Sequence, residues 1–72
     1  MRNKTLSSLI GKNLRVSRQH RGMSQVKLAL RLGVSRAAIS NYEKGRQDFL
    51  ISTLAKISYI LDVPIHVLTG RR

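Results

Sequence analysis

The sequence predicts a single, small, all-helical domain. Apolar residues recur at intervals of three and four, glycines separate these stretches, and no segment alternates apolar and polar residues long enough to predict a strand. A chain of 72 residues suffices for one domain and leaves little room for a catalytic cavity between domains. We therefore expect one domain over residues 1–72, built from five helices.

The first helix is expected to end near His20, with Thr5 or Ser7 as its cap. Its apolar stripe consists of Leu6, Leu9, Ile10 and Leu14. Gly11 lies inside this helix and costs about 1 kcal/mol relative to alanine. Either the helix tolerates that cost or a neighbouring segment approaches closely there.

Glycines and serines delimit the next two helices. Gly22 stops the first helix, Ser24 caps a second helix from Gln25 to Leu32, and Gly33 ends that helix at positive φ. Ser35 then caps a third helix that runs to about Lys44. Its inward residues are expected to be Ala38, Ile39 and Tyr42, and its outward residues Arg36, Ala37, Ser40 and Asn41.

Two further helices follow a polar connection. Asp48 is the expected cap of the fourth, whose apolar positions are Phe49, Leu50, Leu54, Ile57 and Leu61. Pro64 suits the first turn of a short fifth helix through Leu68, and Gly70 ends it. Tyr59, like the other aromatic residues, is expected to pack in the core.

The charge of the chain predicts an anionic partner. The formal net charge is +11, and every charged residue before Glu43 is basic. Such an excess cannot pair internally, so an anionic ligand would relieve its mutual repulsion. A content of 42% hydrophobic residues argues against a disordered basic tail.

Residues 25–44 are typical of a helix-turn-helix unit, in which two short helices are joined by a glycine-containing turn. The unit needs a small residue where the helices cross, a flexible residue at the turn, and apolar residues that lock the helices together. Those positions hold Ala29, Gly33, Val34, Ile39 and Tyr42.

From Ile10 to Leu68 the chain resembles the Cro/C1-type, or XRE, family of phage repressors and bacterial regulators. The residues that carry the resemblance are Leu14, Arg18, Gly22-Met23-Ser24-Gln25, Leu28-Ala29, Gly33-Val34-Ser35, Ile39, Tyr42-Glu43, Gly45, Thr53-Leu54, Lys56-Ile57, Leu61 and Leu68. The resemblance implies an all-α, compact five-helix bundle of the lambda-repressor-like type. It also implies binding to a double-stranded DNA operator as a homodimer, with the third helix in the major groove.

The resemblance assigns roles to individual positions. The base-reading residues would be Arg36, Ala37, Ser40 and Asn41, with Arg36 either paired to guanine or acting as a nonspecific phosphate clamp. The phosphate-binding residues would be Gln25, Ser35, Lys44 and Arg46. The alternatives are that Gln25 only occupies the first helical turn and that Ser35 serves only as a cap.

Two further assignments concern charge and assembly. The resemblance pairs Arg18 with Glu43, although a solvent-facing Glu43 is the alternative. The chain departs from the family pattern at Phe49-Leu50, and at Val67, where a charged residue is common. Ile65 and Val67 therefore suggest a dimer interface, unless Ile65 simply completes the core.

The composition argues against several other classes of protein. Cysteine is absent, which excludes disulfides and thiolate catalysis, and His20 and His66 lack metal-ligand neighbours. We expect no enzyme activity, no metal and no cofactor, and no small-molecule ligand is evident from the sequence. No signal peptide or membrane span is evident, so a cytoplasmic protein is expected.

The function that the sequence favours is that of a sequence-specific DNA-binding transcriptional regulator, which binds a palindromic operator as a dimer and represses transcription. One rival keeps the fold but makes the chain an antitoxin that autoregulates and binds a toxin. A rival of another class is a cationic membrane-surface protein. RNA binding is less favoured, because the usual sheet and loop modules are missing.

Overall fold

The computed structural model describes residues 4–70, which form five helices and no strand. The helices are α1 (Lys4–His20), α2 (Gln25–Leu32), α3 (Arg36–Glu43), α4 (Ile51–Leu61) and α5 (Ile65–Thr69). The predicted all-α architecture and the order of its five helices are confirmed.

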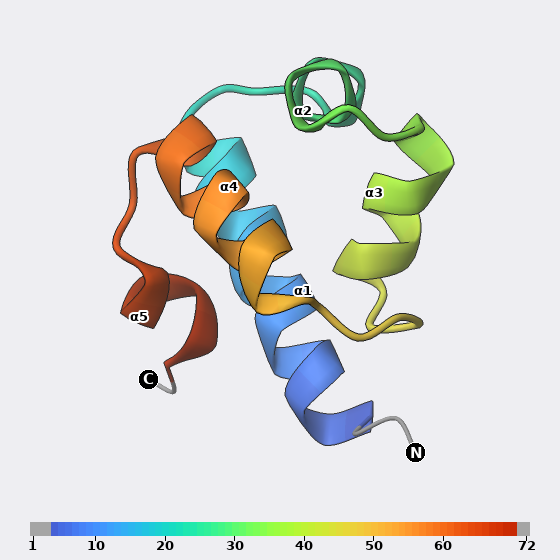
Figure 1. Cartoon of the computed structure of the whole chain (residues 1–72), viewed down its shortest axis with the longest axis vertical. Coiled ribbons are helices and arrows are strands. Elements are labelled where there is room, and N and C mark those ends of the chain that lie inside the picture. Colours follow the sequence, from blue (N-terminus) through green and yellow to red (C-terminus); the bar gives the residue numbers. More distant parts are fainter. Residues whose placement is uncertain (1–3, 71–72) are drawn as a thin grey trace.

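The longest helix, α1, holds the other helices together. It packs against α3 and α5, which lie on opposite sides of it (Figure 1), while α2 packs against α3 and α4. Leucine and isoleucine side chains from all five helices fill the interior. The largest fully buried side chains are Leu14, Leu28, Ile39, Ile57, Leu61 and Leu68.

The first turn of α1 differs from the prediction. The helix already includes Lys4, so the two predicted caps, Thr5 and Ser7, lie inside it. Ser7 is buried and donates a hydrogen bond to the Asp48 carboxylate. Leu6, expected in the apolar stripe, is 46% exposed, so the stripe that enters the core begins further along the helix.

Gly11 marks the closest approach of α1 to α3. A Cβ atom at this position would lie 2.2 Å from the carbonyl oxygen of Tyr42 and 2.9 Å from that of Glu43. Of the two explanations for a glycine inside this helix, close approach is therefore the correct one. It brings the middle of α1 against the last turn of α3.

The start of α4 also differs from the prediction. The helix begins at Ile51, and Leu50 occupies the cap position without any side-chain hydrogen bond. Asp48, the predicted cap, instead accepts the hydrogen bond from Ser7. Phe49 stacks on Tyr42 with ring centroids 4.6 Å apart. These two contacts hold the connection, so the chain turns helical later than expected.

The C-terminal part of the described chain is tied back to α1. Pro64 lies in extended conformation just before α5 rather than in its first turn. The side-chain amide of Asn13 donates to the carbonyls of Leu68 and Gly70 at 2.8 and 3.0 Å. The prediction that Tyr59 packs in the core is wrong, because this residue is 88% exposed.

Candidate nucleic-acid interface

The turn between α2 and α3 is fixed by two serine caps and a glycine. The hydroxyl oxygens of Ser24 and Ser35 each accept a 3.0 Å hydrogen bond from the backbone N–H three residues later. Gly33 adopts a φ of 76°, and its N–H donates to the carbonyl of Ala29 at 2.9 Å. Both predicted caps and the predicted end of α2 are confirmed. Val34, expected to lock the helices together, is 38% exposed.

The two faces of α3 have different environments. Ile39 is fully buried and Tyr42 is 7% exposed, as expected for the inward face. The opposite face carries Arg36, Ala37, Ser40 and Asn41. The first two of these residues are exposed and the last two are half-buried. This face is therefore not packed into the interior of the described chain.

A buried ion pair joins α3 to α1. The guanidinium of Arg18 donates to the Glu43 carboxylate through Nε, at 2.6 Å to Oε2, and through Nη2, at 3.1 Å to Oε1. The two side chains are only 10% and 4% exposed. Nη1 of Arg18 also donates to the carbonyl of Met23, at 2.8 Å. Arg18 thus holds α3 and the loop before α2 in fixed positions, and Glu43 does not face solvent.

Gln25 links this ion pair to the outward face of α3. Its side-chain Nε2 donates to Oε1 of Glu43 at 3.0 Å, and its Oε1 accepts from Nη1 of Arg36 at 3.1 Å. A continuous chain of hydrogen bonds therefore runs from Arg18 through Glu43 and Gln25 to Arg36. Gln25 was predicted as a phosphate-binding residue, and the structure places both polar atoms of its side chain against protein partners.

A polar hollow of about 250 Å³ lies beside this chain of hydrogen bonds. It is lined by Arg15, Arg18, Gln25, Ser40, Glu43 and Lys44. Because Glu43 is already paired, the exposed Arg15 and Lys44 leave the rim cationic. Arg15 was not among the residues predicted from the sequence. The available signal was its position three residues before Arg18, which puts both on one side of a helix.

The remaining predicted residues lie outside α2 and α3. Arg46 is exposed in the connection after α3, close in sequence to Lys44. Ile65 and Val67 lie on α5, which packs on the opposite side of α1 from α3 (Figure 1). Ile65 is 42% exposed, so it does not complete the core, and Val67 is half-buried against α1.

Within residues 4–70, no group of three or more His, Asp or Glu side chains is arranged to hold a metal ion. None of the five helices is both long and apolar enough to span a bilayer.

Relatives in sequence are transcriptional regulators. An HTH-type transcriptional regulator of Sinorhizobium medicae is 43% identical over 56 residues, which cover 78% of this chain and 40% of the relative. One from Rhizobium meliloti matches to the same extent. The chain thus spans about 40% of the length of these curated relatives.

Solved structures share the fold. The N-terminal DNA-binding domain of SinR from Bacillus subtilis superposes with a TM-score of 0.80 at 32% identity, covering 90% of this chain and 96% of that one. SinR solved in complex with DNA gives a TM-score of 0.75 at 35% identity, covering 82% and 95%.

The same fold also occurs within an enzyme. Hydroxypropylphosphonic acid epoxidase from S. wedmorenis matches with a TM-score of 0.89 at 26% identity, over 94% of this chain and 36% of that one. Fold likeness alone therefore does not decide function. The family is decided by sequence: the model of the helix-turn-helix family HTH_3 matches residues 14–68. The chain belongs to this Cro/C1-type helix-turn-helix family.

Proposed function

We propose that this chain is the DNA-binding part of a transcriptional regulator, and that it reads double-stranded DNA with the outward face of α3. The major groove of B-DNA is wide enough to admit a helix, and its base edges distinguish all four base pairs. The regulator binds a palindromic operator as a two-fold dimer and represses by occupying promoter DNA. Acting on cellular DNA, it works in the cytoplasm.

The observation that carries this proposal is the anchoring of Arg36. Its Nη1 atom is held by Gln25, which is held in turn by the buried Glu43. The Nε–Nη2 edge of Arg36 donates no hydrogen bond within the described part of the chain, so it is available for two parallel bonds to guanine O6 and N7. A guanidinium fixed before binding loses less rotamer entropy when the complex forms. This arrangement favours base reading over a nonspecific clamp.

Cations on either side of α3 support phosphate binding. Arg15 and Lys44 lie on the rim of the polar hollow, and Arg46 is exposed beyond the end of α3. The free backbone amides at the starts of α2 and α3 add partial positive charge at Gln25 and Ser35. These groups add affinity without sequence preference.

The dimer rests on α5. Ile65 is 42% exposed on this helix, and an apolar side chain there suits a contact across a two-fold axis. A dimer spaces its two recognition helices about one turn of DNA apart. Analytical ultracentrifugation tests this part: Ile65→Asp should shift the protein toward monomer, and an unchanged sedimentation profile would refute the assignment.

The experiment that tests the central proposal compares Arg36→Ala with Lys56→Ala. Lys56 is also an exposed cation, but it lies on α4, outside the helix-turn-helix unit. Fluorescence anisotropy would measure Kd for a duplex selected by the wild-type protein and for a scrambled duplex. Arg36→Ala should lower the ratio of the two affinities by about 5- to 150-fold, since a bidentate pair contributes about 1–3 kcal/mol of discrimination. Lys56→Ala should leave that ratio unchanged.

Two outcomes would contradict the proposal. One is an Arg36→Ala protein that retains the full preference for the selected duplex. The other is wild-type protein that binds anionic lipid vesicles more tightly than any duplex, which would favour a membrane-surface function instead.

A further inference from the structure

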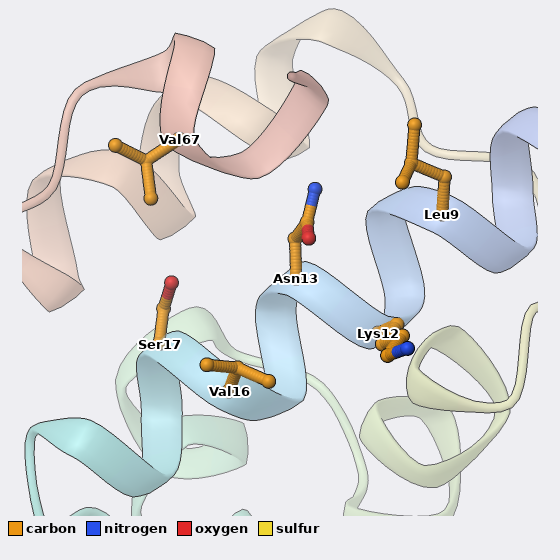
Figure 2. A pocket seen from close by; sticks show the side chains of 6 residues that line it. All are labelled: Leu9, Lys12, Asn13, Val16, Ser17 and Val67. Carbon is orange, nitrogen blue, oxygen red and sulfur yellow. The ribbon is translucent and has the colours of Figure 1, made fainter. Parts of the chain in front are cut away.

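A second hollow lies between α1 and α5, away from the proposed DNA-binding face. Its volume is about 290 Å³, and Leu9, Lys12, Asn13, Val16, Ser17 and Val67 line it (Figure 2). Five of these residues come from α1 and one from α5. Because α3 packs on the opposite side of α1 (Figure 1), DNA binding does not account for this groove.

The walls of the groove combine aliphatic surface with one cation. Leu9 and Val67 are half-buried, and Val16 is 56% exposed. Lys12 is exposed at the edge, and no acidic residue lines the groove. A small site with apolar walls and a few polar groups is the usual form of a small-molecule site, although this volume is at the lower limit of about 300 Å³.

Ser17 supplies the second polar group. The residue is 7% exposed, and its hydroxyl points from α1 toward the α5 side of the groove (Figure 2). Within residues 4–70 this hydroxyl forms no hydrogen bond. Every fully buried side-chain oxygen or nitrogen of the described chain has a hydrogen-bond partner. Because the Ser17 oxygen has no partner, it is not fully buried and must retain some access from the groove. A nearly buried hydroxyl without a partner is a group that a ligand can satisfy.

The groove is formed before any ligand arrives. Asn13, at its centre, holds the end of α5 through the two hydrogen bonds to the carbonyls of Leu68 and Gly70. These bonds fix the α5 wall, which carries Val67, relative to α1. A preformed site avoids the cost of ordering its own walls on binding.

We propose that this groove binds a small organic carboxylate with a short aliphatic body and a polar group at its far end. The carboxylate pairs with the Lys12 ammonium, the aliphatic body packs on Leu9, Val16 and Val67, and the Ser17 hydroxyl bonds the far polar group. Lys12 and Ser17 are five residues apart on α1, which is roughly 7.5 Å along the helix axis and about 140° around it. The two groups therefore lie at opposite edges of the groove, and the long, flexible Lys12 side chain has to reach across the helix surface toward a ligand. We use 6-hydroxyhexanoate as the probe, because a flexible chain of five methylene groups joins its carboxylate to its hydroxyl.

The site has a consequence for assembly that rests on the proposed dimer. Val67 is both a wall of the groove and a proposed dimer contact. A ligand in the groove and a second copy of the chain then compete for this side chain, so the ligand should favour the monomer. The binding itself does not depend on the dimer or on DNA.

Methyl NMR titration with 6-hydroxyhexanoate tests the proposal. The expected result is a saturable shift of the Leu9, Val16 and Val67 methyl signals. Lys12→Ala should weaken binding about 2- to 5-fold, as for an exposed ion pair. Ser17→Ala should weaken it about 2- to 12-fold, as for one hydrogen bond, and should not disturb folding because the hydroxyl forms no internal bond. Lys56→Ala, which removes a cation elsewhere, should have no effect.

The charge-reversed compound 6-amino-1-hexanol is the matched control. Equal shifts with both compounds, or shifts that survive Lys12→Ala and Ser17→Ala unchanged, would overturn the proposal. Methyl shifts that depend on protein concentration but not on the added probe would also overturn it, because they would show that the groove is a contact between copies of the chain. Duplex binding measured on the same variants distinguishes a failure of the groove proposal from a failure of the proposed DNA-binding function.

Discussion

Removing either charge of the Arg18–Glu43 ion pair should strongly destabilise the fold. The two side chains are 10% and 4% exposed, and their charged groups are joined by hydrogen bonds of 2.6 and 3.1 Å. Truncating one partner leaves the other charge buried and unpaired, which costs about 3–5 kcal/mol. For a domain of this size Tm moves about 4–8 °C per kcal/mol, so Glu43→Ala should lower Tm by roughly 12–40 °C.

The assay is urea and thermal unfolding of Arg18→Ala, Glu43→Ala and the double variant, followed by far-ultraviolet circular dichroism. Once one charge is gone, removing the other relieves an unpaired buried group. The double variant should therefore lose less stability than the sum of the single variants, by about 0.5–3 kcal/mol. Strictly additive losses, with m-values unchanged, would refute the reasoning that the pair acts as a unit.

Three further changes have defined outcomes. Gly11→Ala places a Cβ against the backbone of α3, so it should lower the free energy of unfolding in urea by about 1–3 kcal/mol or more. This loss should exceed that of Gly22→Ala, because nothing lies within 4 Å of a Cβ at Gly22 and only the positive φ opposes the change. Ser35→Ala should cost about 0.5–2 kcal/mol through loss of the cap. By the same measurement Ser52→Ala should cost almost nothing, because Ser52 is exposed on α4 and its side chain forms no hydrogen bond within the described residues. Equal losses would show that the cap is unimportant. Lys44→Ala should weaken all duplexes alike and reduce the slope of log affinity against log salt by about one, and a change confined to one duplex sequence would contradict its role as a phosphate contact.

Features set by neighbouring residues could be predicted from the sequence. The helix ends are of this kind: Ser24 and Ser35 cap helices through bonds to amides three residues away, and Gly33 ends a helix through its own φ. The inward face of α3 follows from the spacing of its apolar residues. Such features require no knowledge of the rest of the fold.

Features set by residues distant in sequence could not be predicted in the same way. Asp48 has the residue type and position of a helix cap, but its partner is Ser7, which lies 41 positions earlier in the chain. Tyr59 belongs to an aromatic class that is often buried, but the stripe of Leu54, Ile57 and Leu61 already forms the inward face of α4.

The candidate site was predicted as separate roles and not as one network. The resemblance paired Arg18 with Glu43 and placed Gln25 and Arg36 at the surface. That a single glutamine side chain bridges Glu43 and Arg36 depends on the crossing of α2 and α3, which no local pattern contains. Gln25→Ala is therefore informative about how firmly Arg36 is held.

Selection of bound duplexes from a random pool, with wild-type protein and with Arg36→Ala, tests most directly whether the outward face of α3 reads base edges. The wild-type pool should converge on two symmetric half-sites with centres about 10–10.5 base pairs apart, each containing an invariant guanine. The Arg36→Ala pool should lose the preference at that guanine and keep the spacing. A wild-type pool that fails to converge, or an unchanged motif in the variant, would contradict the account.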